Sequence, residues 1–524
     1  LPRFTDFYVI MKVLSVYLKN IRYYNLSESS INVCQHRRYN NYCFPRVSQV
    51  FQPSDSVPNP KESTTKLQNA AQLVTKHGMV HQCSAGQIAV LPLFQRALDK
   101  LCTIVEEQMQ AVSAYKMTMP TLTPQQLWKK TGRFEEAGPE LMVLEDRHEK
   151  RFILSPTHEE AICDIVATCF PKDVPKSRLP LRLYQITTKF RDEARPRHAL
   201  IRSREFLMKD LYTFDVDEAA AAETYNAVSE AYNTIFSRIG VPFIRARGSC
   251  GAVGGKYSHE FHYLSPAAGQ DYVLSCASCG YSATAGLLQE TGLLPDDTEL
   301  VKHGPTDGPT VPCQNCDSGN MDAAVGVEVG HTFLLGTTYS KPMKVVHRDM
   351  DMKLQPLVMG CYGLGMTRIV QASLDVTCQQ QPYEDSIVWP WSLAPYRVCI
   401  IGPKRGSKEK EAQHWVETLG RNIEQQVPVL RGDVILDDRD NLSIGKRVLD
   451  ARKTGYPLIV VVGKAALQDV PKFELIDNTE VYRELIGCGE IASLERHKEG
   501  KGGALLSQLQ LLNVLGEFCN RLQR

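Results

Sequence analysis

Several groups that could bind a nucleotide triphosphate occur close together in residues 184–210, YQITTKFRDEARPRHALIRSREFLMKD. They are three guanidiniums, a carboxylate and an aromatic ring: Arg191, Arg202, Arg204, Glu193 and Phe206. Each guanidinium can donate two hydrogen bonds to phosphate oxygens, and the ring can lie against a purine. A solvated surface more often carries lysines and scattered charges. The pattern, set between two strand-like runs, therefore predicts a nucleotide site.

A second candidate lies in residues 359–368, MGCYGLGMTR. Glycines at positions 360, 363 and 365 let a strand-to-helix turn pass close to a ligand, and Arg368 falls on the first turn of the following helix. Alone, such a pattern marks a tight packing turn as often as a site. Together with the upstream arginines, it predicts that Arg368 contacts the same nucleotide.

The elements that must position these groups follow from apolar spacing. Residues 93–113 and 217–239 repeat apolar residues every three or four positions, which is typical of amphipathic helices. Residues 152–170 indicate a strand, a turn and a helix, and residues 241–275 indicate strands with glycine-rich turns. From residue 389 onward strands alternate with helices, which predicts a smaller α/β domain with a largely parallel sheet.

Composition narrows the class of protein. The 524 residues, 43% hydrophobic and 23% charged, suffice for two or three ordinary soluble domains. A net charge of +1 will not steer a nucleic acid, so any such contact has to come from local basic patches. No run of about 18 apolar residues occurs, so no membrane span is expected. Sixteen cysteines without a disulfide-framework spacing favour a reducing compartment.

The first 53 residues differ from the rest. They contain seven Lys or Arg against only Asp6 and Glu28, and they end in a Pro/Ser linker near residues 51–60. A basic, acidic-poor and partly amphipathic segment is typical of a mitochondrial transit peptide. We therefore expect residues 1–60 to be a leader and the protein to reach the mitochondrial matrix. The alternative is a leader without a targeting role and a cytoplasmic protein.

Six motifs occur in a fixed order: PTHEE, FRDE, RSREF, GGKYSHEF, EVGH and GCYGLGMTR. In this order they resemble the class II aminoacyl-tRNA synthetases, and in particular the prolyl-tRNA synthetases of bacterial and organellar type. The resemblance covers roughly residues 66–490. It implies an α+β fold, with a catalytic domain on an antiparallel sheet over residues 61–388 and an α/β anticodon-binding domain over residues 389–524. A homodimer is also implied, because helix 93–113 and the short strand after it are similar to the motif that forms the dimer interface in this class.

The resemblance implies that the chain acts on ATP, L-proline and tRNA(Pro), with Mg²⁺ bridging the phosphates. Activation is attack of the amino-acid carboxylate on the α-phosphorus of ATP, so the protein supplies fixed positive charge and alignment more than an acid or a base. Arg191 is expected at the α-phosphate and the substrate carboxylate, and Glu193 orients it and contacts the base. By resemblance, Arg202 meets the outer phosphates and Phe206 stacks on the adenine. Arg368 is expected to hold the γ-phosphate and to cover the other face of the adenine, and Glu328 is expected near ATP and its metal.

Proline offers a charged secondary amine and an apolar ring, so its site needs a carboxylate, a hydroxyl and an apolar wall. By resemblance, Thr157 and Glu159 hold the amine, and the ring is lined by His331, Phe333 and Phe261. The same segment also has the form of a capping box, because Glu160 follows Thr157 by three residues. We expect both to hold, with Glu160 capping the helix while Glu159 faces the site.

Cys276-x-x-Cys279 and Cys313-x-x-Cys316 resemble a four-cysteine zinc site. However, 33 residues separate the two pairs, more than the usual gap of about 15–20. The spacing leaves open a structural zinc or a loop without metal. Four thiolates leave no open coordination position, so a catalytic zinc is not expected.

Residues 276–326 stand where many bacterial relatives insert an editing domain. Only 65 residues separate Phe261 from Val327, so we expect no hydrolysis of alanyl-tRNA by this chain. A proline pocket cannot strongly exclude the smaller alanine by binding alone. In the C-terminal domain, Arg439 and Lys446 are candidate tRNA contacts. The alternative, given equal weight, is that both are ordinary surface charges.

Two rival interpretations are compatible with parts of this pattern. A non-catalytic, synthetase-like subunit that binds tRNA or a partner would be expected to lose the motif arginines, whereas Arg191, Arg202 and Arg368 are present. A threonyl-type synthetase uses a pocket zinc, for which the chain offers no Cys/His/His set. The arginines therefore favour an enzyme that activates proline.

Overall fold

The computed structural model describes residues 43–53, 70–294, 311–316, 319–379, 385–480, 483 and 503–522. Contacts divide the chain into Leu1–Pro45 and Arg46–Arg524, and the elements below belong to the second unit. Apart from residues 43–53, the predicted leader lies outside the described residues.

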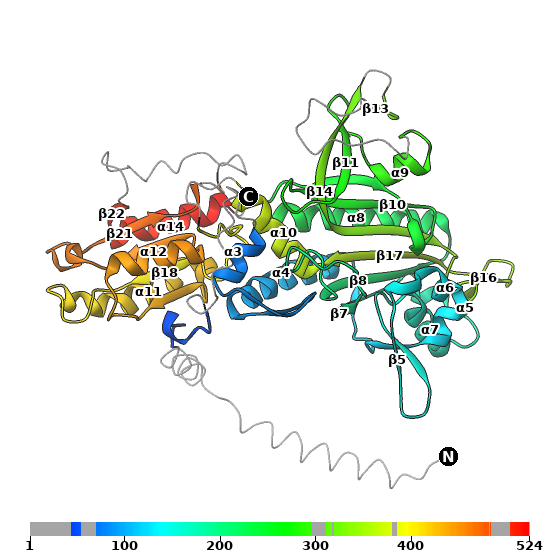
Figure 1. The fold of residues 1–524 in the computed structure, drawn as a ribbon, viewed down its shortest axis with the longest axis horizontal. Coiled ribbons are helices and arrows are strands. Elements are labelled where there is room, and N and C mark those ends of the chain that lie inside the picture. The colour runs from blue at the N-terminus through cyan, green and yellow to red at the C-terminus, as the bar shows by residue number, and fades with distance from the viewer. Residues whose placement is uncertain are drawn as a thin grey trace, which may run out of the picture. The chain divides into compact units, whose positions relative to one another are not determined.

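The N-terminal two thirds of the chain contain a large sheet, which has ten strands among the described residues (Figure 1). Its central pairings, β7–β8, β8–β17 and β17–β14, are all antiparallel, as expected for the implied catalytic domain. In spatial order the strands are β10 (Tyr257–Leu264), β9 (Ile244–Gly248), β12 (Ser282–Thr284), β11 (Asp271–Cys276), β14 (Asn320–Gly336), β17 (Val358–Gly365), β8 (Glu205–Asp215), β7 (Leu181–Phe190) and β3 (Tyr115–Lys116), with β13 (Val311–Pro312) paired to β14.

One face of this sheet is covered by three helices: α4 (Pro92–Ala111), α8 (Glu218–Ile239) and α10 (Met366–Cys378). Helix α8 begins where the Asp217 side chain accepts a hydrogen bond from Ala220 N at 2.9 Å, and it ends at Gly240, whose φ of 77° suits a left-handed cap. Its buried face recurs every three or four residues, as the spacing predicted. This periodicity explains why α8 packs its apolar side on the sheet.

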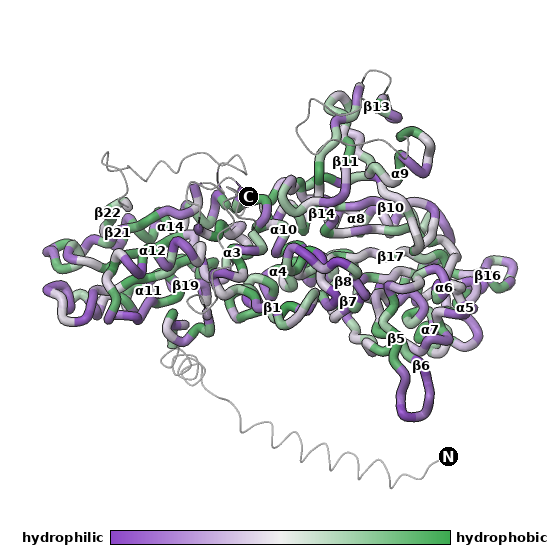
Figure 2. The backbone as a smooth tube through the Cα atoms, in the orientation of Figure 1, coloured by the Kyte–Doolittle hydropathy of each residue, from purple (hydrophilic) through white to green (hydrophobic). Residues whose placement is uncertain are grey.

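The opposite face carries α7 (Glu159–Cys169) and a smaller sheet. Alternate residues of β8 divide between the two faces, so that Leu211 joins the core under α8 whereas Tyr212 and Phe214 join the core under α7. Around this second core lie α5 (Gln125–Thr131), α6 (Arg133–Ala137) and the antiparallel strands β4 (Leu122–Pro124), β6 (Arg151–Leu154) and β5 (Met142–Glu145). The tip of the β5–β6 hairpin is strongly hydrophilic (Figure 2).

The C-terminal domain is α/β, as predicted, but its sheet is mixed. Strands β19 (Val434–Asp437), β18 (Val398–Ile401) and β20 (Leu458–Val461) are parallel and fully buried, whereas β21 (Lys472–Asp477) and β22 (Ala504–Ser507) are antiparallel additions. Buried parallel strands read as continuous apolar runs, which is why they were visible in the sequence. In the described part of this domain, the α-helices are α11 (His414–Gln426), α12 (Ile444–Thr454) and α14 (Gln508–Leu522).

Among the described residues, the remaining α-helices and strands are α3 (Ala70–Lys76), α9 (Ala285–Glu290), and the hairpins β1 (Val80–Ser84)–β2 (Gln87–Val90) and β15 (Val346–Arg348)–β16 (Leu354–Pro356). Within the described part of the chain, no helix combines the length and apolar character needed to cross a bilayer.

Candidate active site

Two adjoining chambers open on the central strands of the large sheet. The first has a volume of about 500 Å³ and a mainly charged lining, and the second has a volume of about 640 Å³ and a more apolar lining. Five residues line both chambers: Pro139, Glu140, Arg191, Glu328 and Arg368. A ligand in one chamber would therefore meet a ligand in the other beside Arg191 and Arg368.

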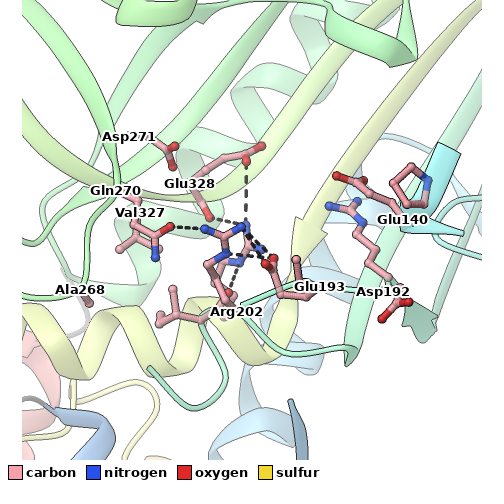
Figure 3. Close-up of a pocket in the computed structure, with 14 residues that line it drawn as sticks. Glu140, Asp192, Glu193, Arg202, Ala268, Gln270, Asp271, Val327 and Glu328 are labelled. Atoms are coloured by element: carbon pink, nitrogen blue, oxygen red, sulfur yellow. Dashed lines mark hydrogen bonds and ion pairs between the residues drawn. The ribbon is translucent and has the colours of Figure 1, made fainter. Parts of the chain in front are cut away.

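In the first chamber, Glu193 and Arg202 form a two-pronged pair. Arg202 donates from Nε and Nη2 to the two carboxylate oxygens of Glu193, each at 2.9 Å, and Nη1 donates to Gln270. Figure 3 shows Glu193, Arg202, Gln270 and Glu328 gathered on one side, with Glu140 across from them. Burial opposes ionisation of Glu193, but hydrogen bonds from Arg195 N and Arg202 outweigh it and lower the pKa of that carboxyl.

Glu328 and Arg368 meet on the wall that the chambers share. Arg368 donates from Nη1 to Glu328 O at 3.1 Å and from Nε to Ile201 O at 3.0 Å, which fixes its guanidinium at the start of α10. The Glu328 carboxylate accepts from His331 Nδ1 at 3.0 Å. Burial alone would raise its pKa, yet the His331 hydrogen bond and the charges of His331 and Arg368 hold the pKa of Glu328 well below its usual range. Glu328 is therefore an anion at neutral pH.

Arg191 follows the last residue of β7 and lies between the chambers, with its guanidinium 5.3 Å from the centre of the Phe206 ring. Burial lowers the pKa of Arg191, and the positive charge of Arg368 lowers it further. Two guanidiniums that repel each other across one space are relieved by an anion placed between them. The geometry thus suits a phosphate or carboxylate at this point. Arg204 lines neither chamber and instead donates to Glu193 O at 3.1 Å.

The second chamber contains a buried carboxylate at its floor. Thr157 Oγ1 donates to the carboxylate of Glu159 at 2.7 Å, Arg133 Nη1 approaches it to 3.0 Å, and Cys361 Sγ lies 3.1 Å away. Burial raises the pKa of Glu159, but the Arg133 charge and the Thr157 hydrogen bond outweigh it, and the net shift is downward. A buried anion of this kind can bind a cationic amine, and Thr157 supplies a hydroxyl beside it.

An apolar wall faces this carboxylate. The rings of His331 and Phe333 stack with centroids 3.8 Å apart, and both line the chamber together with Trp128 and Met208. Gly363 and Gly365 also line it, and without Cβ atoms they let the backbone itself form part of the chamber wall. The chamber therefore places the Glu159 carboxylate beside an apolar surface, in addition to the charged residues that it shares with the first chamber.

Two expectations are corrected here. Helix α7 has His158 as its N-cap residue, without a side-chain cap, and Glu160 bonds to Arg133 and Thr131 instead of capping. Thr157 Oγ1 donates to Glu159, and the Glu160 carboxylate is held by Arg133 and Thr131, so neither side chain caps the helix and the capping box does not form. Phe261 is fully buried and stacks on Phe236 with centroids 5.1 Å apart, so its ring belongs to the core under α8 and not to the chamber wall.

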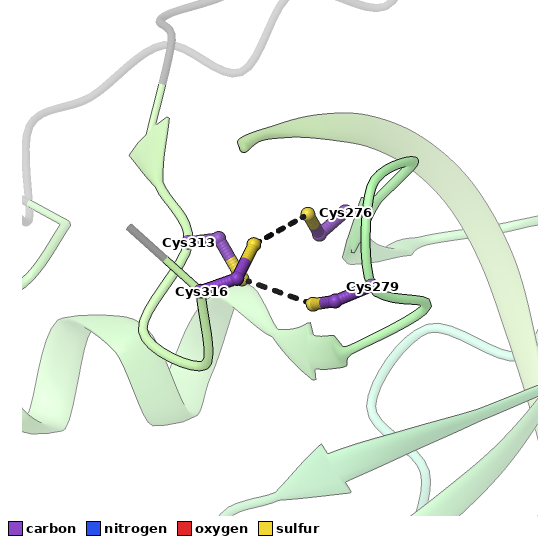
Figure 4. Close-up of side chains that lie close together, drawn as sticks. All are labelled: Cys276, Cys279, Cys313 and Cys316. Carbon is purple, nitrogen blue, oxygen red and sulfur yellow. Dashed lines mark hydrogen bonds between the residues drawn. The ribbon is translucent and has the colours of Figure 1, made fainter. Parts of the chain in front are cut away.

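The other predicted residues lie apart from the chambers. The sulfurs of Cys276, Cys279, Cys313 and Cys316 all lie within 4.8 Å of one another (Figure 4). In the C-terminal domain, Arg439 bonds to Asp437 at 2.7 Å and Lys446 pairs with Asp450 at 2.9 Å. Both cations are thus held by carboxylates on their own domain.

Several chamber residues had no signal in the sequence. Arg133 comes from the short helix α6, where it pairs with Glu159 and Glu160 and lies over the Trp128 ring at 4.8 Å. Gln270 belongs to a loop before β11 and meets Arg202 only in three dimensions. Neither residue stands in a repeating pattern, so only the folded structure identifies them.

Comparison with known proteins places this site in context. Residues 142–377 match the tRNA synthetase class II core domain (G, H, P, S and T), and residues 398–486 match the anticodon binding domain. The chain is 42% identical over 434 residues to the probable mitochondrial proline–tRNA ligase of Rattus norvegicus, covering 82% of this chain and 86% of that protein. The corresponding protein of Homo sapiens is 40% identical, covering 83% and 88%.

A proline–tRNA ligase of Geotalea daltonii is 31% identical over 592 aligned positions, covering 88% of this chain and all of that protein. Among solved structures, the Giardia lamblia prolyl-tRNA synthetase in complex with prolyl-adenylate is similar, with a TM-score of 0.63 and 17% identity. It covers 87% of this chain and 78% of that one, and at this identity it supports the fold alone.

Proposed function

The chain belongs to the prolyl-tRNA synthetase family, and we propose that it joins L-proline to tRNA(Pro) through a prolyl-adenylate. In the first step a proline carboxylate oxygen attacks the α-phosphorus of ATP, and the bond to pyrophosphate breaks. In the second step a ribose hydroxyl of the terminal adenosine attacks the prolyl carbonyl, and AMP leaves. The observation that carries the proposal is the pair of chambers that meet at Arg191 and Arg368.

The first chamber is the proposed ATP site. Arg191 aligns the α-phosphate with the substrate carboxylate, and Arg202, oriented by Glu193, meets the outer phosphates. Phe206, which lines the second chamber beside Arg191, and Arg368, which lines both chambers, are proposed to cover the two faces of the adenine where the chambers meet. The chemistry needs positive charge that is already in place when the negative charge on the phosphoryl oxygens grows.

Mg²⁺ is the proposed metal partner of ATP. Glu328 supplies an ionised carboxylate in the ATP chamber, and Asp271 lines the same space. Burial and the nearby charge of Glu328 raise the pKa of Asp271, so a cation that neutralises Glu328 would also favour the ionised form of Asp271. Carboxylate oxygens are the ligands that Mg²⁺ prefers. When bound, the ion would neutralise phosphate charge.

The second chamber is the proposed proline site. Glu159 and Thr157 hold the secondary amine, and His331 and Phe333 form the wall for the ring. Glu159 is positioned by Arg133, which leaves the carboxylate ionised in the absence of substrate. Burial of an unpaired carboxylate would be costly, and the ion pair with Arg133 avoids that cost.

We also propose that the chain lacks an editing domain in cis. The alignment with the Geotalea daltonii relative runs over 592 positions, more than the 524 residues of this chain, whereas that with the rat relative runs over 434. This difference supports an internal segment that the bacterial protein has and this chain lacks. We expect the enzyme to form alanyl-tRNA(Pro) slowly and to leave it intact, and rapid deacylation of that product by the purified protein would overturn this part.

The C-terminal domain is proposed to read the anticodon, with Arg439 and Lys446 as candidate contacts, and the enzyme is proposed to be a homodimer in the mitochondrial matrix. The basic composition of the first 53 residues and the mitochondrial relatives support this location.

Aminoacylation tests the whole proposal. The purified protein is expected to charge a tRNA(Pro) transcript with labelled proline in an ATP-dependent reaction, and a transcript with an altered anticodon is expected to be a poorer substrate. Binding of tRNA without charging would contradict it and would favour a non-catalytic subunit.

A further inference from the structure

Four cysteine sulfurs converge from two separate turns at the end of the large sheet (Figure 4). Cys276 Sγ lies 3.7 Å from Cys316 Sγ, and Cys279 Sγ lies 3.6 Å from Cys313 Sγ. A disulfide requires about 2.05 Å between sulfurs. Four sulfurs around one zinc at about 2.3 Å would lie about 3.8 Å apart at the corners of a tetrahedron. The observed spacing fits the second arrangement.

The turns are built to present sulfur. In the first turn, Gly280 N donates to Cys276 O at 2.9 Å, with Gly280 at a φ of 74°, and Cys276 N donates to Tyr281 O at 2.8 Å. In the second, Cys313 N donates to Gly319 O at 2.8 Å. A Cβ on Gly319 would collide with Cys276 Sγ, so this glycine leaves room for the sulfurs.

Hydrogen-bond donors also point at the sulfurs. Asn315 N lies 3.4 Å from Cys313 Sγ, and Asn315 Nδ2 lies 3.7 Å from Cys279 Sγ. Such second-layer donors spread the negative charge of thiolates that bind a metal. A chance group of neutral thiols has no need of them.

The surrounding core is small. Among the described residues it consists of nine buried side chains, two of which are the cysteines themselves: Leu274, Cys276, Ala283, Ala285, Leu288, Leu294, Val311, Cys313 and Met321. Small cores of this size are commonly reinforced by a structural metal. Helix α9 fills part of the interval between the two cysteine pairs, which explains why the gap is longer than usual.

We propose that Cys276, Cys279, Cys313 and Cys316 together bind one structural Zn²⁺, which fastens the end of β11 to the strands β13 and β14. The four thiols release their protons to solvent as the ion binds, and no redox step is involved. The ladder from Cys276↔Met321 leads back to Asp271↔Gly326, so the metal secures strands that also carry the Asp271 and Glu328 carboxylates of the first chamber. With all four positions filled by sulfur, the ion has no catalytic position. The site does not depend on the proposed reaction.

Metal analysis of the full chain, purified under reducing conditions, tests the proposal. Elemental mass spectrometry is expected to find about one zinc per chain, and replacement by Co²⁺ is expected to give the absorption bands of a tetrahedral four-thiolate site. Metal-free protein with four reactive thiols, bound iron, or a disulfide among these cysteines would overturn it. Because the wild-type chain is measured, the result does not depend on the folding of a variant.

Two variants and a control locate the ion. Cys279→Ser and Cys316→Ser are expected to lower zinc content at least about tenfold. The control Cys83→Ser changes an exposed cysteine outside the cluster and is expected to keep it. Removal of zinc with a chelator is expected to speed hydrogen exchange in β11. Zinc retained in both cluster variants, or unchanged exchange, would contradict the site or its fastening role.

Discussion

The two chambers treat charge in opposite ways. In the ATP chamber the charged groups are partly open to water, with side-chain exposures of 36% for Arg202 and 28% for Arg368. In the proline chamber Glu159 is 1% exposed and its partner Arg133 is 10% exposed. Phosphates arrive highly charged and need several accessible cations, whereas a small amine is selected by one dry, fixed anion. In the proposed function, the more exposed chamber provides ATP binding and alignment, and the more buried charge of the other chamber provides selectivity for proline.

The largest effect is expected at the junction of the chambers. Arg191→Ala should reduce the rate constant for adenylate formation by about 10³-fold, because the proposed function places this guanidinium where negative charge develops. Arg191→Lys retains the positive charge but not the two-pronged hydrogen bonding of a guanidinium, so it should recover only part of the lost rate. Pyrophosphate exchange measures both, with thermal melting as the folding control. A near-normal rate in Arg191→Ala would remove this residue from the chemistry.

A change of charge in the proposed proline chamber should affect the KM values of the two substrates differently. Glu159→Gln keeps the shape of the side chain and removes its charge, so the KM for proline should rise by about 100-fold, since it loses a buried ionic contact. The KM for ATP should stay within about threefold of wild type. Comparable changes in both constants would sink the role of Glu159 as the amine ligand.

The ion pair with Arg133 should decide how proline binding depends on pH. In the wild type the lowered pKa of Glu159 keeps it ionised, so the KM for proline should be flat from about pH 8 to about pH 6. Arg133→Gln removes the largest influence that lowers this pKa, and burial then raises it. The carboxyl should take up a proton as the pH falls, and the KM for proline should rise by about tenfold over the same range. A flat profile in the variant would show that Arg133 does not control the charge.

The open chamber should respond more weakly and should be sensitive to salt. Arg202→Ala is expected to raise the KM for ATP by about tenfold, because a half-exposed guanidinium contributes modestly to binding. The KM for proline should not change. Titration with added salt should weaken ATP binding by the wild type more than by the variant, and identical salt dependence would argue against a phosphate contact.

The smallest effect on catalysis is expected at Phe261. Because this ring packs on Phe236 under α8, Phe261→Leu should lower the free energy of unfolding by about 1 kcal/mol and leave the KM for proline unchanged. Chemical denaturation and steady-state kinetics measure the two quantities. A raised KM for proline with an unchanged free energy of unfolding would instead indicate that Phe261 lines the proline pocket.

These residues also show what sequence can reveal. The arginine pattern was recognisable because β7 and β8 are adjacent antiparallel strands, so residues near their joined ends stay close in space. The buried parallel strands of the C-terminal domain and the face of α8 were visible through apolar spacing. Local periodicity and the pairing of consecutive strands carry this kind of information.

The missed features depend on long-range contacts. The alternation of apolar and polar residues along β10 does not identify the face of the strand that meets the pocket. A register shift between Phe261 and His262 further obscures this pattern. The capping box does not form because Thr131 and Arg133, more than twenty residues away, hold the Glu160 carboxylate. Arg133 reaches Glu159 across 26 positions from a five-residue helix without a pattern.

Amino-acid-dependent exchange of pyrophosphate into ATP, measured with all twenty amino acids, tests the central claim most directly. The paired chambers predict strong exchange with proline and weaker exchange with alanine, because an apolar pocket that holds the proline ring cannot exclude a smaller side chain. Exchange that prefers another amino acid, or none with any of the twenty, would contradict the account.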